Sequence, residues 1–93
     1  MPNAAKEVTI VNSLGLHARP AMQFVDLANE FASQIHVLRH GDEDYEVDGK
    51  SVMQMITLEA GQGTCLRISA AGDDAEQAVI KLAELIENKF GEE

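Results

Sequence analysis

The first third of the chain carries two different hydrophobic periods. Val8 and Ile10 alternate with polar neighbours, which is typical of a strand with one buried face. After a loop at residues 13–16, apolar side chains recur with helical spacing, and Pro20 stands in the first turn, where its missing N–H would be unpaired anyway. The helical positions are Ala21, Phe24, Val25, Ala28, Phe31 and Ala32. The pattern predicts a strand and then a helix that begins close to His17.

The middle of the chain predicts a hairpin. Ile35 and Val37 alternate with polar residues, and the alternation resumes at Tyr45 and Val47 after an acidic turn at residues 40–44.

A short apolar helix is predicted after the hairpin. Ser51 stands three residues before Gln54, which is the spacing of a capping box. In the apolar segment 52–56 helical spacing separates Met55 from Met53, so we expect Met55 in the core and Met53 at the surface.

The last third predicts one more strand and one more helix. Leu66, Ile68 and Ala70 alternate with polar residues, and Asp73 and Asp74 precede a helical pattern at the end where acidic side chains are favourable. The helical positions are Ala75, Val79, Leu82, Ala83, Ile86 and Phe90. The order β-α-β-β-α-β-α fits an α+β protein in which a four-stranded antiparallel sheet carries three helices on one face. We expect residues 1–93 to form one domain.

Composition excludes several classes of function. A net charge of −9, from 7 basic and 16 acidic residues, argues against binding nucleic acid, whose phosphates require basic patches. No apolar run approaches the roughly 20 residues that span a bilayer, and residues 1–6 lack the apolar stretch of a signal peptide. We therefore expect a cytoplasmic protein without membrane contact.

Metal, cofactor and disulfide chemistry are not indicated. His17, His36 and His40 lack the spacing and companion ligands of a metal site, and no paired carboxylates suggest a stand-alone enzyme. We expect His36 and His40 to be ordinary surface residues on or near a strand. Cys65 is the only cysteine, so no internal disulfide can form, and its apolar neighbours suggest a structural strand position.

His17 and Arg19 are the residues with candidate chemistry. The start of a helix exposes unpaired backbone N–H groups and carries the positive end of the helix dipole, which together stabilise anions. A neutral imidazole nitrogen can attack phosphorus, and a guanidinium offers forked donors to phosphoryl oxygens. The simpler reading is that His17 only caps the helix and that Arg19 is a solvated charge.

Two motifs resemble those of a known family. Residues 15–21 resemble the active-site motif of the HPr family, the histidine phosphocarriers of bacterial phosphotransferase systems, and residues 47–53 resemble its regulatory serine site. The resemblance runs from about Glu7 to about Phe90 and includes residues 61–64 and 71–74.

The resemblance implies a fold and a reaction. The fold is the open-faced β-sandwich of HPr. His17 would accept a phosphoryl group, derived from phosphoenolpyruvate, from Enzyme I and pass it to EIIA domains, while Arg19 and the backbone N–H groups of Ala18 and Arg19 hold the phosphoryl oxygens. The chain would then be a monomeric carrier without a cofactor, not an enzyme in its own right.

A carrier needs an exposed apolar patch beside its reactive atom, because it docks on several partners in turn. The candidates are Leu16, Met22, Val52, Met53 and Ile56. The resemblance places the equivalents of Val52, Met53 and Ile56 at the family's interface.

Ser51 has two compatible interpretations. Serine is among the best N-caps, and loss of such a cap costs about 1 kcal/mol. The resemblance makes the same residue a target of an HPr kinase/phosphorylase, and a phosphate there would add charge to the edge of the apolar patch. The alternative function is a regulatory module, controlled through Ser51 and docking transcriptional regulators, that never carries phosphate on histidine.

Two departures from the family bear on partners. Asp26, Asn29 and Gln54 stand at or near positions where many HPr proteins carry lysines, so we expect an Enzyme I with a less acidic surface, or slower encounter. The ending at residues 88–93, with residues 12–15, is similar to the nitrogen-branch paralogue NPr. The sugar and nitrogen branches therefore both stay open.

Overall fold

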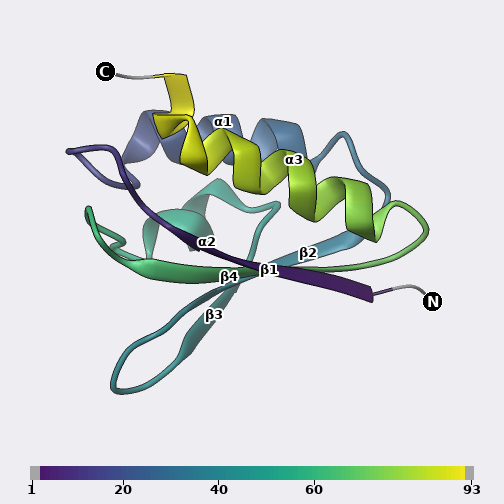
Figure 1. Cartoon of the computed structure of the whole chain (residues 1–93), viewed down its shortest axis with the longest axis horizontal. Helices are drawn as coiled ribbons and strands as arrows, with labels where there is room; N and C mark the ends of the chain where they lie inside the picture. Colours follow the sequence, from purple (N-terminus) through teal and green to yellow (C-terminus); the bar gives the residue numbers. More distant parts are fainter. Residues whose placement is uncertain (1–2, 92–93) are drawn as a thin grey trace.

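The computed structural model describes residues 3–91, which form one sheet and a layer of helices (Figure 1). The strands are β1 (Asn3–Thr9), β2 (Gln34–Arg39), β3 (Tyr45–Asp48) and β4 (Cys65–Ala71). The helices are α1 (Ala18–Ala28), α2 (Val52–Ile56) and α3 (Ala75–Glu87), followed by the short 3-10 turn η1 (Lys89–Gly91).

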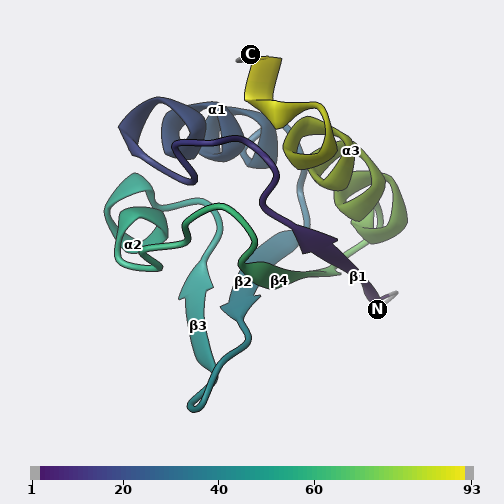
Figure 2. The ribbon, with the colours of Figure 1, turned by 60° about the vertical axis from the view of Figure 1, so that its left-hand side comes forward.

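The four strands form an antiparallel sheet in the order β1-β4-β2-β3. Helices α1 and α3 lie side by side over one face, with α2 beside α1 and near β3, and the other face is uncovered (Figure 2). The predicted element order and the open-faced α+β fold are confirmed.

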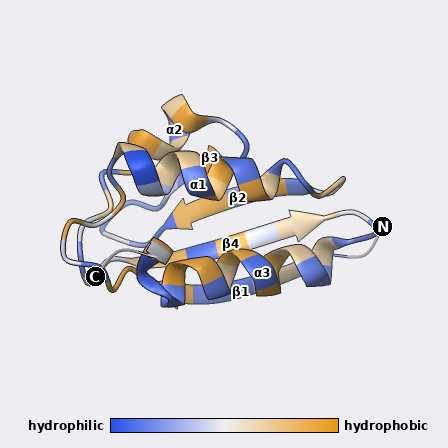
Figure 3. Ribbon diagram, turned by 90° about the horizontal axis from the view of Figure 1, so that it is seen from above, coloured by the Kyte–Doolittle hydropathy of each residue, from blue (hydrophilic) through white to orange (hydrophobic). Residues whose placement is uncertain are grey.

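The core lies between the sheet and the helices. Alternate strand residues point toward the helices, as the period of a strand requires. From the sheet these are Val8, Ile35, Val37, Val47, Leu66 and Ile68, and from α1 and α3 the largest are Phe24, Val25, Val79, Leu82 and Ile86. Hydrophobic and hydrophilic residues alternate along α1 and α3, as expected of helices with one buried face (Figure 3).

Two helices end earlier than their apolar spacing suggests. Helix α1 stops at Ala28, because the Asn29 amide donates to the Val25 carbonyl at 3.0 Å and the Phe31 N–H turns back to the Ala28 carbonyl at 3.2 Å. Phe90 lies beyond α3, in a turn with a left-handed φ of 56°, and is still buried. The spacing therefore predicted the burial of Phe90, but not the helix ends, and beyond the end of α1 Phe31 is only half-buried and Ala32 is exposed.

Asp74 joins two loops instead of capping α3. Its carboxylate accepts hydrogen bonds from the N–H of Ala32 at 2.8 Å, from the N–H of Ser33 at 3.0 Å and from the Ser33 hydroxyl. Asp74 is the N-cap residue of α3, at the helix start as predicted, but its side chain makes no cap hydrogen bond. The Ser33 hydroxyl, followed by the Ala32 N–H, holds the pKa of Asp74 below its ordinary 3.8.

Asp74→Asn should lower the free energy of unfolding in a way that depends on pH. A lowered folded pKa means that the charged carboxylate stabilises the native state fully above pH 3.8, and that this contribution is lost as the pH falls through the folded pKa. Urea unfolding at pH 7 should therefore separate wild type from Asp74→Asn, and the gap should narrow steadily below about pH 4. The matched control is Asp73→Asn, an exposed neighbouring carboxylate. A gap independent of pH would contradict the assigned role of the charge.

Within residues 3–91, no helix combines the length and the apolar character needed to cross a membrane.

Candidate functional site

His17 is delivered by a loop that rests on a second loop. We call residues 11–17 the site loop and residues 60–64 the support loop. Ile10, at the entrance, exchanges backbone hydrogen bonds with Thr64 at 2.9 Å and Gly63 at 2.8 Å, and further along the Leu16 N–H donates to the Ala60 carbonyl at 2.8 Å. The support loop thus holds the site loop at both ends.

Gly15 is required where the two loops touch. Its φ is +69°, a conformation that side chains rarely adopt, and a Cβ there would lie 2.6 Å from the Ala60 carbonyl oxygen and 2.7 Å from the Gly61 Cα. Both are backbone atoms, so neither can rotate out of the way. Only glycine lets the site loop lie this close to its support.

His17 is the N-cap residue of α1, but its side chain does not cap the helix. Its backbone is extended, with φ −88° and ψ −170°, and no side-chain cap hydrogen bond is formed. The half-buried imidazole therefore lies at the helix start without accepting a capping hydrogen bond from the first turn. This geometry removes the main support for the simpler reading in which His17 is only a cap.

Two backbone N–H groups at the start of α1 remain for an anion. Of the four residues whose N–H groups lack intrahelical partners, Pro20 has no N–H and His17 donates to the Gly15 carbonyl at 3.1 Å. The first helical bond runs from Ala21 to the His17 carbonyl at 3.0 Å. Ala18 and Arg19, both exposed, supply the other two donors.

The charges around the helix start favour an anion. The first turn of α1 contains no acidic residue, and Arg19 forms no ion pair with any carboxylate of residues 3–91. The helix dipole adds positive potential at the same place. The start of α1 thus brings together an imidazole, a guanidinium and two N–H groups on three consecutive residues, which is a chemistry suited to a tetrahedral oxyanion beside a nucleophilic nitrogen.

Ser51 caps α2 as predicted, but the capping box is only half formed. Its Oγ accepts from the Gln54 N–H at 3.2 Å. The Gln54 side chain does not return to Ser51, and its Oε1 accepts from the Asp48 N–H at 2.9 Å instead. The amide of Gln54 therefore fixes the turn between β3 and α2.

The far end of α2 is held by the hairpin. Arg39 donates to the Leu58 carbonyl at 2.5 Å, and the hydroxyl groups of Tyr45 and Thr57 lie 2.9 Å apart. Met55 and Leu58 are fully buried beneath. A helix of 5 residues would not be stable alone, so these contacts determine its position.

The expected docking residues divide into exposed and buried ones. Met53, Met22 and Ile56 are exposed, by 77%, 54% and 41%, and Met55 is in the core as predicted. Val52 is half-buried at the edge of the core. We call Met22, Val52, Met53 and Ile56 the apolar patch.

Leu16 does not meet the expectation of an exposed docking residue. Its side chain is 6% exposed and belongs to the core, because the bond from its N–H to the Ala60 carbonyl turns the loop inward there. The sequence interpretation missed Leu14, which lies in the site loop and is 72% exposed. Its position two residues before Leu16, on a short loop, was the available signal.

The three positions that depart from the family are all at the surface. Asp26, Asn29 and Gln54 are exposed. Asn29 ends α1 and Gln54 fixes the turn before α2, so these two side chains have structural contacts that a lysine would not reproduce. At these three positions the surface is therefore acidic or neutral rather than basic.

The other candidates for chemistry lie elsewhere. His36 is on β2, and His40, just after it, has its Nε2 2.8 Å from a carboxylate oxygen of Glu7. Cys65 lies on a strand as predicted, but its thiol side is exposed rather than packed in the core. Among the described residues, no group of three or more histidine, cysteine, aspartate or glutamate side chains is arranged to hold a metal ion.

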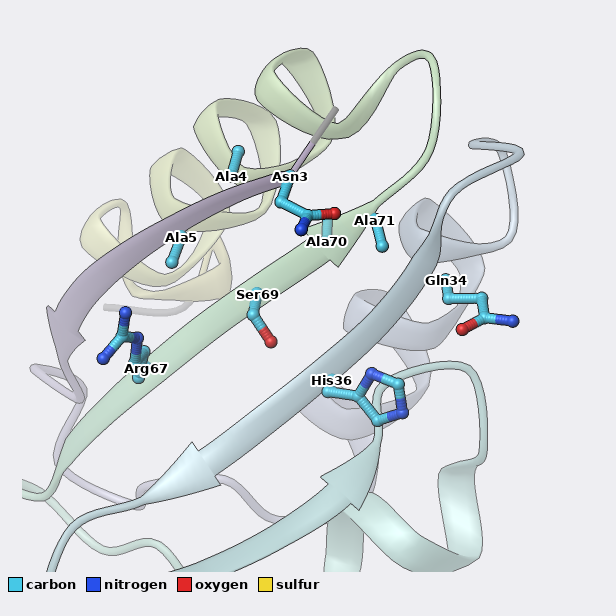
Figure 4. Close-up of a pocket in the computed structure, with 9 residues that line it drawn as sticks. All are labelled: Asn3, Ala4, Ala5, Gln34, His36, Arg67, Ser69, Ala70 and Ala71. Carbon is cyan, nitrogen blue, oxygen red and sulfur yellow. The ribbon is translucent and has the colours of Figure 1, made fainter. Parts of the chain in front are cut away.

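A hollow of about 410 Å³ lies on the uncovered face of the sheet (Figure 4). Asn3, Gln34, His36 and Arg67 rim it, and Ser69 lies on its floor among alanines. It lies near the start of β1, whereas His17 follows the other end of that strand. The hollow and the His17 site are therefore separate.

Known proteins with the same sequence features share this architecture. Residues 4–88 match the family model described as PTS HPr component phosphorylation site. The phosphocarrier protein HPr of Pseudomonas aeruginosa is 44% identical over 88 residues, covering 95% of this chain and 96% of the relative, and the phosphocarrier protein NPr of Proteus mirabilis is 39% identical with the same coverage. A crystal structure of HPr from Thermoanaerobacter tengcongensis superposes with a TM-score of 0.87 at 46% identity, covering 97% of this chain and 98% of that one. The chain belongs to the HPr family, the phosphocarrier proteins of the phosphotransferase system.

Proposed function

We propose that this protein carries a phosphoryl group on His17 between Enzyme I and EIIA domains of a phosphoenolpyruvate-dependent phosphotransferase system. The observation that carries the proposal is the N-cap position of an imidazole that does not itself cap α1, next to the N–H groups of Ala18 and Arg19. Membership in a family of phosphocarriers agrees with this assignment.

The transfer needs one nucleophile and several donors. The lone pair of the ring nitrogen nearest the helix start attacks phosphorus, a P–N bond forms, and the bond to the donor protein breaks with its electron pair remaining on the donor. The N–H groups of Ala18 and Arg19 and the Arg19 guanidinium then face the phosphoryl oxygens. The reverse sequence delivers the group to the next protein, so no net change occurs in the carrier.

Partner recognition falls to the apolar patch. Methionine and aliphatic side chains repack easily, which suits successive docking on unlike proteins. Met53 and Met22, the most exposed members, supply adaptable contact area beside the site. Because the whole chain carries a net charge of −9, we further propose that its Enzyme I presents a less acidic docking surface than is usual.

Intact-mass measurement after incubation with phosphoenolpyruvate and Enzyme I tests the proposal. One added phosphoryl group, lost in acid and absent when Enzyme I is omitted, is the expected result. Enzyme I from a sugar branch and from a nitrogen branch, tried separately, identifies the system by the faster reaction. No added mass with either would contradict the carrier function and favour the regulatory module.

We also propose that phosphorylation of Ser51 weakens docking without unfolding the protein. Its Oγ already accepts from the Gln54 N–H at 3.2 Å, and phosphate oxygens can accept from the same donor. The added charge would lie at the start of the helix that carries Met53 and Ile56. Desolvating that charge on docking opposes binding.

Ser51→Asp should slow phosphoryl transfer from Enzyme I on the order of tenfold, mainly through a higher half-saturating concentration. Aspartate caps helices about as well as serine, so the free energy of unfolding should change little. The matched control is Ser51→Asn, which keeps the cap and the shape without the charge, and it should transfer at nearly the wild-type rate. Equal transfer rates for Ser51→Asp and Ser51→Asn would contradict the proposed effect of the added charge on docking.

A further inference from the structure

The site loop contains a fully buried polar side chain whose contacts lead to His17. Among the described residues the buried polar or charged side chains are Asn12, on the site loop, and Ser33, between α1 and β2. Burying an amide without a hydrogen bond is costly, so its partner indicates what it does. One partner of Asn12 is the Gly15 carbonyl, in the backbone two residues before His17.

The Gly15 carbonyl links Asn12 to His17. The Asn12 Nδ2 donates to this carbonyl at 2.7 Å, and the His17 N–H donates to the same oxygen at 3.1 Å. The Gly15 N–H in turn donates to the Asn12 carbonyl at 3.2 Å. Asn12, Gly15 and His17 therefore share one small hydrogen-bonded turn.

This turn completes the anchoring of the peptide between Gly15 and Leu16. Its N–H side is held by the Leu16 bond to the Ala60 carbonyl at 2.8 Å, and its carbonyl side is held by the buried Asn12 amide. Because glycine permits a wide range of backbone torsions, both contacts help to fix this plane, and the Gly15 carbonyl in turn orients the His17 N–H. His17 is the N-cap of α1, so the same torsions decide how the imidazole faces the N–H groups of Ala18 and Arg19.

We propose that Asn12 is a positioning residue for phosphoryl transfer: through the Gly15 carbonyl it holds the His17 backbone in the orientation that reaction requires. The proposal rests on the phosphocarrier function proposed above. It adds that the arrangement of the site depends on a side chain that never touches the phosphoryl group. Holding a nucleophile in place contributes strongly to rate, and small displacements slow transfer substantially.

The test compares variants that remove one buried polar side chain each. Asn12→Ala removes the donor, and Asn12→Leu removes it while keeping much of the volume, so that one folded variant is available if the other is too unstable. Ser33→Ala is the matched control, because Ser33 is equally buried but bonds to Asp74 rather than to the site loop. Circular dichroism and urea unfolding select conditions under which each variant is folded.

The kinetic readout separates positioning from general stability. The maximal rate of phosphoryl transfer from Enzyme I should fall about tenfold in the folded Asn12 variants, with the half-saturating concentration unchanged because the apolar patch is intact. Ser33→Ala should keep both values. The proposal would be overturned if the maximal rate fell no further in the Asn12 variants than in Ser33→Ala. It would also be overturned if only the half-saturating concentration rose.

Hydrogen exchange tests the same proposal without any transfer. The amide of His17 should exchange faster in the Asn12 variants than in wild type or Ser33→Ala, because its acceptor is no longer held. Unchanged exchange overturns the positioning role even if transfer is slowed. Failure of wild type to take up phosphate would instead contradict the carrier function, and exchange would still decide the role of Asn12.

Discussion

His17→Ala will stay folded and take up no phosphoryl group from phosphorylated Enzyme I. The imidazole is half-buried and does not cap α1, so the variant should still fold, with a loss in the free energy of unfolding of about 1 kcal/mol, as is typical of a substitution outside the core. The N–H groups of Ala18 and Arg19 remain, but without a nucleophile no covalent bond to phosphorus forms. Intact mass of the variant should be unchanged under conditions in which wild type gains one acid-labile group.

The chain provides its own controls for this result. His36→Ala and His40→Ala remove the other two histidines, which lie on and just after β2. Both should be phosphorylated at close to the wild-type rate. An acid-labile group on His17→Ala that disappears only when His36 or His40 is also replaced would move the carrier site away from α1.

Gly15→Ala should lower the free energy of unfolding by about 2–4 kcal/mol and slow transfer at the same time. The new methyl group meets two different penalties. It enters a left-handed conformation at φ +69°, and it lies 2.6 Å from the Ala60 carbonyl oxygen. Because the backbone of the support loop cannot yield by rotating a side chain, the site loop must move, and His17 moves with it. Urea unfolding and the transfer rate, measured on the same preparation, check both effects.

Gly63→Ala separates the two penalties. Gly63 also has a left-handed φ, of +90°, but nothing lies within 4 Å of the added Cβ. We expect it to lose about 1 kcal/mol from backbone strain alone and to transfer normally. If Gly63→Ala slowed transfer as much as Gly15→Ala, the close approach of the loops would not be the cause.

The elements of the fold could be predicted from the sequence because their periods differ so clearly. Strands were predicted from the alternation at Ile35 and Val37 and at Leu66 and Ile68. A helix was predicted from the spacing of Phe24 and its apolar neighbours. The position of His17 and Arg19 at a helix start could also be predicted, because a proline in the first turn locates that start. The expectation that Met53 is exposed and Met55 buried followed from helical geometry and is confirmed.

The rest depended on contacts between segments distant in the sequence. Asp74 was expected at the start of α3, and no local pattern reveals that Ala32 and Ser33 compete for its carboxylate. Leu16 was expected at the surface because loops usually lie there. Its N–H bonds to the Ala60 carbonyl, and its side chain is buried in the core. The local sequence pattern predicts the type of each element and which of its faces is buried. The burial and hydrogen-bond partners of individual side chains depend on contacts with distant segments.

Pro20 has a thermodynamic consequence for a protein that must give away what it binds. Since it removes one N–H and Gly15 occupies another, two backbone donors are available for the three oxygens of a phosphoryl group. Each additional charge-assisted hydrogen bond would stabilise the phosphoryl group on the carrier further. In the carrier proposed here, a helix start with few backbone donors would therefore keep the group-transfer potential of a phosphoryl group on His17 high, so that its delivery to the next protein would be close to energetically neutral.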